Sequence, residues 1–414
     1  MRLRTIMGVG IAVMGIVVPR VSSAQTIQER ITILEEKVKE RAELLPFDVH
    51  ALVATDYQYS FNRPGSHDVQ LHVFDLNAPS FMINDAALFV TRQREDEPFG
   101  FMISFDFGET SQVVNGVDNQ AIPSLREAYL TYKLPWNMVT TDKPITLKAG
   151  KFVTLLGYEV IKTWSNFNPN IANSISFGFG IPFTHTGAIA DLPVLDMLTF
   201  DLGVVNGWDD ITDNNNGATF LGGMGFAPVD MFSMYISGTY GPEQPNHSGS
   251  SNRGVLSANA TLKATDFLTF AADLTWGNET NIFLPAKGTV GTGYWTGLVG
   301  YIIWQATDKL QLILRPELFN DPEGVRTGGQ TTNLFGGNPA AGPTASTNAQ
   351  KGAGTVWAIT PTIAYQITDH ILARAEYRYD RASRRYFDFG DVVDGNSHVR
   401  GTSNVLLFEG LFAF

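Results

Sequence analysis

A turn that ends in aspartate, followed by apolar residues at every second position, recurs five times along this chain. Two, four and six residues after each aspartate the chain is apolar, and polar or small residues are common between them. Side chains on a strand alternate between its faces, so each copy predicts a strand with one apolar and one polar face. The aspartates are Asp196, Asp230, Asp266, Asp308 and Asp369.

The connections between these strands alternate in length. Each aspartate lies in a tight turn, whereas the connection after the next strand is long. Short turns at one end and long loops at the other are typical of an up-and-down barrel in an outer membrane, and a soluble sandwich rarely keeps this asymmetry. The long connections are expected at 208–217, 241–253, 277–293, 319–354 and 381–402.

Earlier segments extend the same alternation towards the N-terminus. The total predicts an all-β, transmembrane, antiparallel barrel of about 16 strands, with about 14 or about 18 left open. An even number places both ends of the barrel at the short-turn side. Pro316 and Pro361 fall inside predicted strands, where proline removes a ladder hydrogen bond, so bulges or strand ends are expected there. The earlier strands are expected at 47–61, 81–92, 99–107, 125–134, 145–154 and 177–188.

Two segments precede the expected barrel, which spans 46–414. Residues 1–24 have the features of a secretory signal peptide, with arginines before an apolar run and a cleavage site after Ala24. Residues 25–45 carry apolar side chains at heptad-like spacing. They predict a periplasmic amphipathic helix, either a short coiled coil that helps a trimer to assemble or a single helix against the barrel.

Composition narrows the possible functions. The formal net charge is −12, which makes nucleic acid an unsuitable partner. There are 0 cysteines, so the sequence offers no disulfide framework, thiol nucleophile or thiolate metal site. His185 has no accompanying nucleophile motif. His67, Asp68 and His72 share a loop and are candidate metal ligands, but their spacing is loose. The acids of 208–213 are candidates for calcium, with solvated loop acids as the alternative interpretation. We therefore expect a chain that is not an enzyme and holds no cofactor or metal.

A distinctive segment occupies 150–187 and reads GKFVTLLGYEVIKTWSNFNPNIANSISFGFGIPFTHTG. It resembles the β-barrel porin 2 family, the OmpL-like porins of bacterial outer membranes. The resemblance implies a porin fold in a Gram-negative-type outer membrane, with transported solutes that are poorly defined. The residues that carry it are Gly150, Lys151, Gly157, Tyr158, Asn168, Pro169, Pro182, Phe183, Thr184, His185 and Gly187.

The same segment supplies the third long connection, expected at about 155–176, and third loops of porin-like barrels commonly fold inward to narrow the pore. Its charges are Glu159 and Lys162. Across from cationic wall residues they would act as a charge filter. The alternative is a structural loop whose charges pair with the wall. The expected pore-lining wall residues are Lys148, Arg315, Glu317, Arg374, Glu376, Arg378 and Glu409.

The last strand ends at Phe414, which resembles the terminal signature read by the barrel-assembly machinery. Its alternation places Glu409 towards the lumen, since a carboxylate on the lipid face would be costly. The sequence thus predicts an outer-membrane porin, a homotrimer embedded in lipid with periplasmic termini, that passes small hydrophilic solutes by diffusion.

Two alternatives remain open at this point. One is a selective channel for sugars or oligopeptides, with Tyr158, Trp164 and Phe167 as an aromatic track. The other is a surface adhesion or scaffold protein that acts through its long loops while its barrel is plugged.

Overall fold

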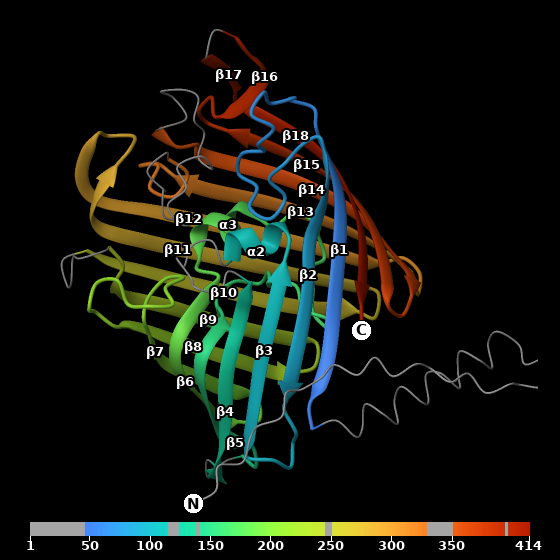
Figure 1. Cartoon of the computed structure of the whole chain (residues 1–414), viewed down its shortest axis with the longest axis vertical. Helices are drawn as coiled ribbons and strands as arrows, with labels where there is room; N and C mark the ends of the chain where they lie inside the picture. The colour runs from blue at the N-terminus through green and yellow to red at the C-terminus, as the bar shows by residue number, and fades with distance from the viewer. Residues whose placement is uncertain (1–45, 115–123, 138–140, 245–250, 329–350, 394–395) are drawn as a thin grey trace, which may run out of the picture. The chain divides into compact units, whose positions relative to one another are not determined.

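The computed structural model describes residues 46–114, 124–137, 141–244, 251–328, 351–393 and 396–414. Within them, sixteen antiparallel strands close into one barrel, each hydrogen-bonded to its neighbours in chain order, and β18 joins β15 to β1 (Figure 1). The expected barrel of about 16 strands is therefore confirmed. The expected signal peptide and amphipathic helix lie outside the described residues.

The barrel strands follow the predicted ranges closely, apart from those discussed below. They are β1 (Asp48–Ser60), β2 (Ser80–Arg92), β3 (Phe99–Phe107), β4 (Leu125–Asn137), β5 (Pro144–Val153), β6 (Thr184–Leu195), β7 (Leu198–Val205), β8 (Thr219–Val229), β9 (Phe232–Pro242), β10 (Asn252–Thr265), β11 (Leu268–Leu284), β12 (Thr289–Gln305), β13 (Leu310–Asp321), β14 (Gly354–Thr368), β15 (Ile371–Ala382) and β18 (Thr402–Ala413). A separate hairpin of β16 (Phe387–Val393) and β17 (Asn396–Arg400) lies in the last long connection.

All five aspartate turns join consecutive strands at one end of the barrel, which we call the short-turn end. The longer connections lie at the other end, the long-loop end. Three of them are used below: L1 (61–79), the connection containing α2 (Glu109–Val114), and L3 (154–183), which contains α3 (Ile175–Gly180).

The predicted strand at 177–188 is wrong in its first half. Phe177, Phe179 and Ile181 alternate with small residues as a strand would, but residues 175–180 form the helix α3. The Ser174 side chain caps it by accepting a hydrogen bond from the Phe177 N–H at 3.1 Å. Every residue of α3 is buried. Its apolar side chains are therefore explained by packing inside the barrel, and their alternation with small residues does not indicate a strand.

The expected long connection at 277–293 is also corrected. Strand β11 extends into this range as far as Leu284, and β12 begins within it at Thr289. Only a short turn remains between the two strands. The two prolines cause no register shift in the β13–β14 pairing. Instead, the pairing of β12 with β13 is interrupted beside Pro316, and that of β14 with β15 beside Pro361, where the missing N–H would be needed.

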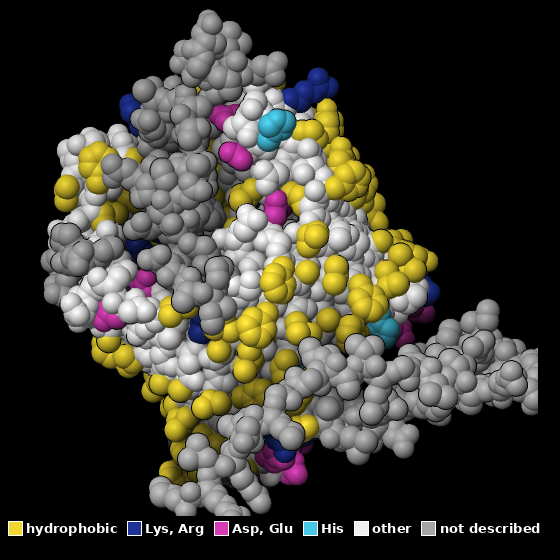
Figure 2. Space-filling view, in the orientation of Figure 1, with side chains coloured by type: hydrophobic (Ala, Val, Ile, Leu, Met, Phe, Trp, Pro, Cys, Tyr) yellow, Lys and Arg dark blue, Asp and Glu magenta, His cyan; other side chains and the backbone are white. Residues whose placement is uncertain are grey.

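The outer face of the barrel is apolar (Figure 2). Phe81 is 84% exposed, and Phe99 and Leu130 are each 68% exposed, which would be costly in water and is expected against lipid. None of the helices in the described part of the chain is long and apolar enough to span a membrane.

Much of the inner face is covered by connections that fold into the barrel. Figure 1 shows α2 and α3 between β2 and β3 on one side and β11, β12 and β13 on the other, as their contacts also show. Apolar side chains of L1, α2 and L3 pack with wall residues in one buried cluster, which we call the lumenal core. It includes Leu71, Val73, Phe74, Val113, Leu156, Ile161, Phe177, Phe179 and Phe183 from the connections, and Phe152, Ile189, Val205, Leu221, Val255, Trp295, Phe319 and Val356 from the wall.

Candidate functional site: the docked third loop

Carboxylates of the inner wall accept hydrogen bonds from the backbone of L3. Glu376 on β15 accepts from the N–H groups of Ile171 at 2.7 Å and Ala172 at 2.9 Å. Glu317 on β13 accepts from the N–H of Ser176 at 2.7 Å. These wall carboxylates therefore satisfy backbone donors that no helix or sheet partner satisfies.

Arginines on the same strands satisfy the backbone acceptors of L3. Arg374 donates to the carbonyl oxygen of Asn170 at 2.9 Å, and Arg378 donates to that of Asn173 at 2.8 Å. A guanidinium presents several N–H groups in a fixed plane, so one arginine can hold a loop carbonyl and a carboxylate together. The alternating charges of β13 and β15 thus form a docking surface for an irregular backbone segment.

Glu159 anchors L3 from the loop side. Its Oε1 accepts from the Arg315 guanidinium at 2.8 Å and from the Tyr301 hydroxyl at 2.9 Å, and its Oε2 accepts from the Ser174 N–H at 2.8 Å. Glu159 is 3% exposed and Arg315 is 0% exposed. A buried ion pair is tolerated only when further hydrogen bonds complete it, as they do here.

Lys162 makes the second buried anchor. Its Nζ donates to Glu409 Oε1 and to Asn84 Oδ1, both at 2.8 Å. Glu409 Oε2 also accepts from Arg374 Nε at 2.6 Å, so one carboxylate joins L3, β15 and β18. Burial disfavours the charged lysine, but the carboxylates of Glu409 and Asp56 together outweigh burial and the nearby Arg374, so the pKa of Lys162 is raised.

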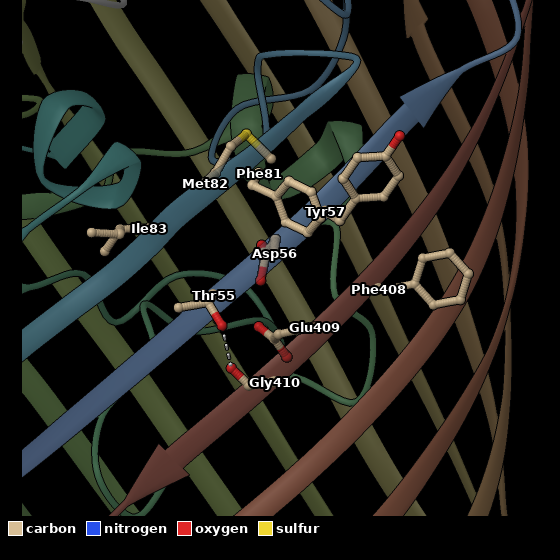
Figure 3. A pocket seen from close by; sticks show the side chains of 9 residues that line it. All are labelled: Thr55, Asp56, Tyr57, Phe81, Met82, Ile83, Phe408, Glu409 and Gly410. Atoms are coloured by element: carbon tan, nitrogen blue, oxygen red, sulfur yellow. Dashed lines mark hydrogen bonds between the residues drawn. The ribbon is translucent and has the colours of Figure 1, made fainter.

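A second acid, Asp56 on β1, lies directly opposite Glu409 in the β1–β18 register. Both carboxylate oxygens of Asp56 are buried without a hydrogen-bond partner in the described structure. Behind this pair, on the lipid side of the wall, lies a pocket of about 530 Å³ (Figure 3). Its outward-facing lining includes Tyr57, Phe81 and Phe408. A lipid-side hollow therefore lies directly outside the strands that carry Asp56 and Glu409.

Burial corrects the expectation of an open charge filter at the predicted pore-lining residues. Lys148 is half-exposed. The other eight are each at most 5% exposed, and they contact L3, its anchors or one another instead of open water. They are Glu159, Lys162, Arg315, Glu317, Arg374, Glu376, Arg378 and Glu409. The structure matches the alternative in which the loop charges pair with the wall.

Solvent-exposed lumenal side chains lie instead on the wall from β5 to β9. Asp191 on β6 is exposed, and Tyr235 on β9 and Lys148 on β5 are half-exposed. Asp191 lies opposite Asp201 on β7, which accepts a hydrogen bond from the Tyr235 hydroxyl at 2.7 Å. Sequence reasoning missed these acids, although their place in the strand alternation already put them on the inner face.

The residues of 150–187 that carry the family resemblance mainly shape the backbone of β5, L3 and β6. Gly150 has a φ of 134°, and an added Cβ would lie 2.1 Å from the carbonyl oxygen of Ala128. Gly187 faces it in the β5–β6 register. Asn168 closes a turn of L3, since its amide bonds both the N–H and the carbonyl of Val160, at 2.8 and 2.9 Å. Close backbone approach and a positive φ require glycine at position 150, and a turn closed by a side-chain amide requires asparagine at position 168.

The remaining members of that segment lie around the base of L3. Thr154 and His185 are joined by a side-chain hydrogen bond of 3.1 Å, and the ring of His185 also contacts the Gly207 carbonyl at 3.2 Å. The backbone N–H groups of Phe183 and Thr184 donate to Asp209 Oδ1 at 2.6 and 2.8 Å. His185 therefore has structural partners. Pro182 is buried, Gly157 has a φ of 90°, Pro169 is half-buried, and Lys151 bonds the Leu125 carbonyl at 3.1 Å.

The three aromatic residues proposed as a track fall into two places. Tyr158 packs on Tyr301 with ring centroids 4.5 Å apart. Trp164, which stacks on His50 at 4.3 Å, and Phe167 both pack against another apolar cluster near the short-turn end. All three keep partial exposure, so a role in solute passage stays a prediction. Among the described residues, no group of three or more His, Asp or Glu side chains is placed to hold a metal ion.

Comparison with solved structures supports the barrel fold. The outer membrane channel DcaP of Acinetobacter baumannii is 13% identical, with a TM-score of 0.55 over 89% of this chain and 97% of that one. An anion-selective porin from Comamonas acidovorans is 7% identical, with a TM-score of 0.53 over 89% and 99%. A trimer form of OmpT from Vibrio cholerae is 10% identical, with a TM-score of 0.52 over 89% and 99%. At these identities the likeness concerns the fold.

No curated protein matches the sequence. The family model described as "Putative beta-barrel porin-2, OmpL-like" matches residues 46–414, which is the whole of the expected barrel. With the closed barrel of sixteen strands, this match shows that the chain belongs to the β-barrel porin 2 (OmpL-like) family of outer-membrane porins.

Proposed function

We propose that this porin passes small hydrophilic solutes by diffusion along the β5 to β9 side of its lumen, and that L3 narrows the passage. The observation that carries the proposal is the uneven docking of L3. Its hydrogen bonds to the wall go chiefly to β10, β11, β13, β15 and β18, and single bonds reach β2, β4 and β9. Asp191 on β6 is exposed and Lys148 on β5 is half-exposed in the lumen, so we infer that the passage lies beside these strands.

The lumenal core sets how narrow this passage is. It reaches wall residues on β6, β7 and β8 as well as the L3 side, including Ile189, Val205 and Leu221. We therefore infer a small conductance for the native chain. The narrow long-loop half of the lumen would limit the flow of ions. The long-loop end would face the cell exterior and both termini the periplasm, as in outer-membrane barrels with short periplasmic turns. Trimeric assembly is supported by the trimer form of the structurally similar OmpT.

The packed lumenal core also favours a second candidate, a plugged barrel that acts through its long loops. Planar-bilayer recording separates the two. The native chain is expected to give small ohmic steps, and deletion of residues 160–174 is expected to enlarge them by removing the docked backbone. Migration on unheated gels shows whether the deleted chain still folds.

The outcomes have distinct meanings. Unchanged step size in a folded deletion variant would remove L3 as the constriction, and absence of steps from both chains would favour the plugged barrel. Steps that a sugar blocks in a saturable way would instead support the selective channel.

A further inference from the structure

Aromatic side chains form a band on the outer face near the long-loop end of β14, β15 and β1. Trp357 on β14 and Tyr379 on β15 pack with ring centroids 5.2 Å apart, and Tyr59 contacts Phe61 at the end of β1 at 5.1 Å. Amphipathic rings at such a level mark the boundary between the hydrocarbon layer and lipid headgroups. Side chains just beyond the band therefore lie at headgroup depth.

Arginines occupy that depth. Arg381 lies two residues beyond Tyr379 on the same outward face and opposite Trp357 in the β14–β15 register, so its backbone is at the outer edge of the band and its long side chain extends towards the headgroups. Arg63 lies two residues beyond Phe61, and its Nε donates to the Tyr59 hydroxyl at 3.2 Å. Both arginines are exposed. Two residues along a strand correspond to a rise of about 7 Å, the thickness of a headgroup layer rather than of the hydrocarbon.

Two more arginines extend this row at the base of the β16–β17 hairpin. Arg400 pairs with Phe387, and its carbonyl accepts from the Tyr386 N–H at 2.8 Å, which brings Arg385 and Arg400 together. Both are exposed, and Arg400 lies over the ring of Phe389. We call the set Arg63, Arg381, Arg385 and Arg400 the rim arginines. Figure 2 shows basic side chains at this upper edge of the apolar face.

Neighbouring acids are turned away from the rim. Asp380 is 0% exposed and accepts from Arg378 at 2.9 Å, and Asp388 is 2% exposed and accepts from the Ser66 hydroxyl at 3.2 Å. Asp68 is half-buried. The short-turn rim is the reverse, because its aspartates, such as Asp230, are exposed. Among the described side chains, the sector of the long-loop rim beside β15, β18 and β1 is therefore basic, although the whole chain carries a net charge of −12.

We propose that the rim arginines bind the phosphate groups of a phosphorylated outer-leaflet lipid, whose acyl chains lie along the apolar outer face of β14, β15, β18 and β1. Guanidinium groups match phosphate oxygens in a bidentate geometry, and clusters of basic residues beside a membrane recognise anionic headgroups. The inference rests on the proposed function for one point, the placement of the long-loop end at the outer leaflet.

Arg384 is not part of the binding set. Its guanidinium donates to the carbonyl oxygens of Lys351 and Pro322, both at 2.8 Å, so it holds the connections together. Its substitution is expected to disturb folding and would not report on lipid binding. The substitutions for the test are therefore Arg381→Gln, Arg385→Gln and Arg400→Gln, made together.

Native mass spectrometry of the full chain in neutral detergent tests the proposal, with lipid A as the probe. The matched control carries Lys263→Gln and Lys309→Gln, two exposed cations at the short-turn rim. The triple variant is expected to bind lipid A at least about tenfold more weakly, and the control as the native chain does. Monophosphoryl lipid A is expected to bind more weakly than the form that keeps both phosphates.

Several results would overturn the proposal. These are equal binding of lipid A by the triple variant, equal binding of a zwitterionic lipid by the native chain, and displacement of lipid A by millimolar inorganic phosphate, which would assign the site to free anions. Gel migration and conductance of the triple variant are expected to be native. Lipid binding is measured in detergent and does not depend on conduction. A negative binding result would therefore overturn the lipid proposal without affecting the channel proposal.

Discussion

Arg374 and Glu409 lie directly opposite each other on β15 and β18, and the arginine Nε donates to Glu409 Oε2 at 2.6 Å. The other carboxylate oxygen of Glu409 accepts from Lys162 of L3 at 2.8 Å. A wall pair that the last strand brings together thus also fixes a loop inside the barrel. Closure of the barrel by β18 and docking of L3 are coupled through one carboxylate.

The change Glu409→Gln tests this coupling. It leaves two buried cations without their carboxylate and is expected to destabilise the folded barrel by about 3 kcal/mol. It should also enlarge single-channel conductance, because Lys162 no longer holds L3. Urea unfolding in detergent and bilayer recording measure the two effects. The control Glu323→Gln breaks a pair with Lys287, which is 57% exposed, and should cost under about 1 kcal/mol. Native stability and conductance in Glu409→Gln would show that the carboxylate does not hold the loop.

Strand alternation identified the inward face of β13 and β15 correctly, yet it could not identify what the inward charges contact. Arg315 and Glu317, like Arg374 and Glu376, follow the pattern that a water-lined pore would show. Their partners include backbone groups of L3 that are distant in the sequence, such as the carbonyl of Ala172, which lies 143 residues from Arg315. A docking surface for irregular backbone and an aqueous wall have the same local pattern, so only the tertiary structure separates them.

The helix α3 was missed for a related reason. Phe177, Phe179 and Ile181 alternate with glycine and proline as in a strand, and the local signal for a helix was confined to the Ser174 cap. Six residues are too few for a helical period to become visible. Asp191 was not predicted as a lumenal residue, although its strand position predicts an inward side chain.

A side chain at Gly150 should prevent correct barrel closure. Its φ of 134° disfavours any L side chain, and a Cβ would lie 2.1 Å from the Ala128 carbonyl oxygen. Gly150→Val is expected to destabilise the barrel by at least about 3 kcal/mol, seen as lost folded yield on unheated gels. Ala149→Val is the control, because Ala149 is exposed on the lipid side of the same strand. Equal yields from both variants would contradict the steric argument.

His72 should make the docking of L1 depend on pH. Burial lowers the pKa of His72, but the carboxylates of Asp75 and Asp380 outweigh burial and the nearby Arg378, so the pKa is raised. The ring Nδ1 contacts Asp75, and Nε2 lies 3.8 Å from Asp380 Oδ2. A raised folded pKa stabilises the protein fully below the unfolded value of about 6.5, and this stabilisation is lost as pH rises through the folded value.

Thermal unfolding between about pH 5.5 and about pH 9 measures this effect. The native chain is expected to lose stability with rising pH relative to His72→Gln, which has no proton to release at this position. His370→Gln serves as the control, since His370 lies at an exposed short turn. Parallel pH profiles for the native chain and His72→Gln would remove His72 as the titrating group.

Ion selectivity should respond to the exposed lumenal charges on β5 and β6. Lys148 Nζ lies over the ring of Tyr129 at 4.8 Å on the wall that L3 leaves accessible, and Asp191 is exposed on the next strand. Asp191→Asn should shift the permeability ratio towards anions by about twofold, and Lys148→Gln should shift it towards cations by a similar factor. Reversal potentials in a salt gradient measure both. The shifts should shrink at about 1 M salt, where the Debye length falls to about 3 Å. Lys309→Gln, at the short-turn end, is the control for a lost charge away from the passage. If neither lumenal variant changes the reversal potential, ions do not pass along this wall, and the proposed route beside β5 to β9 is wrong.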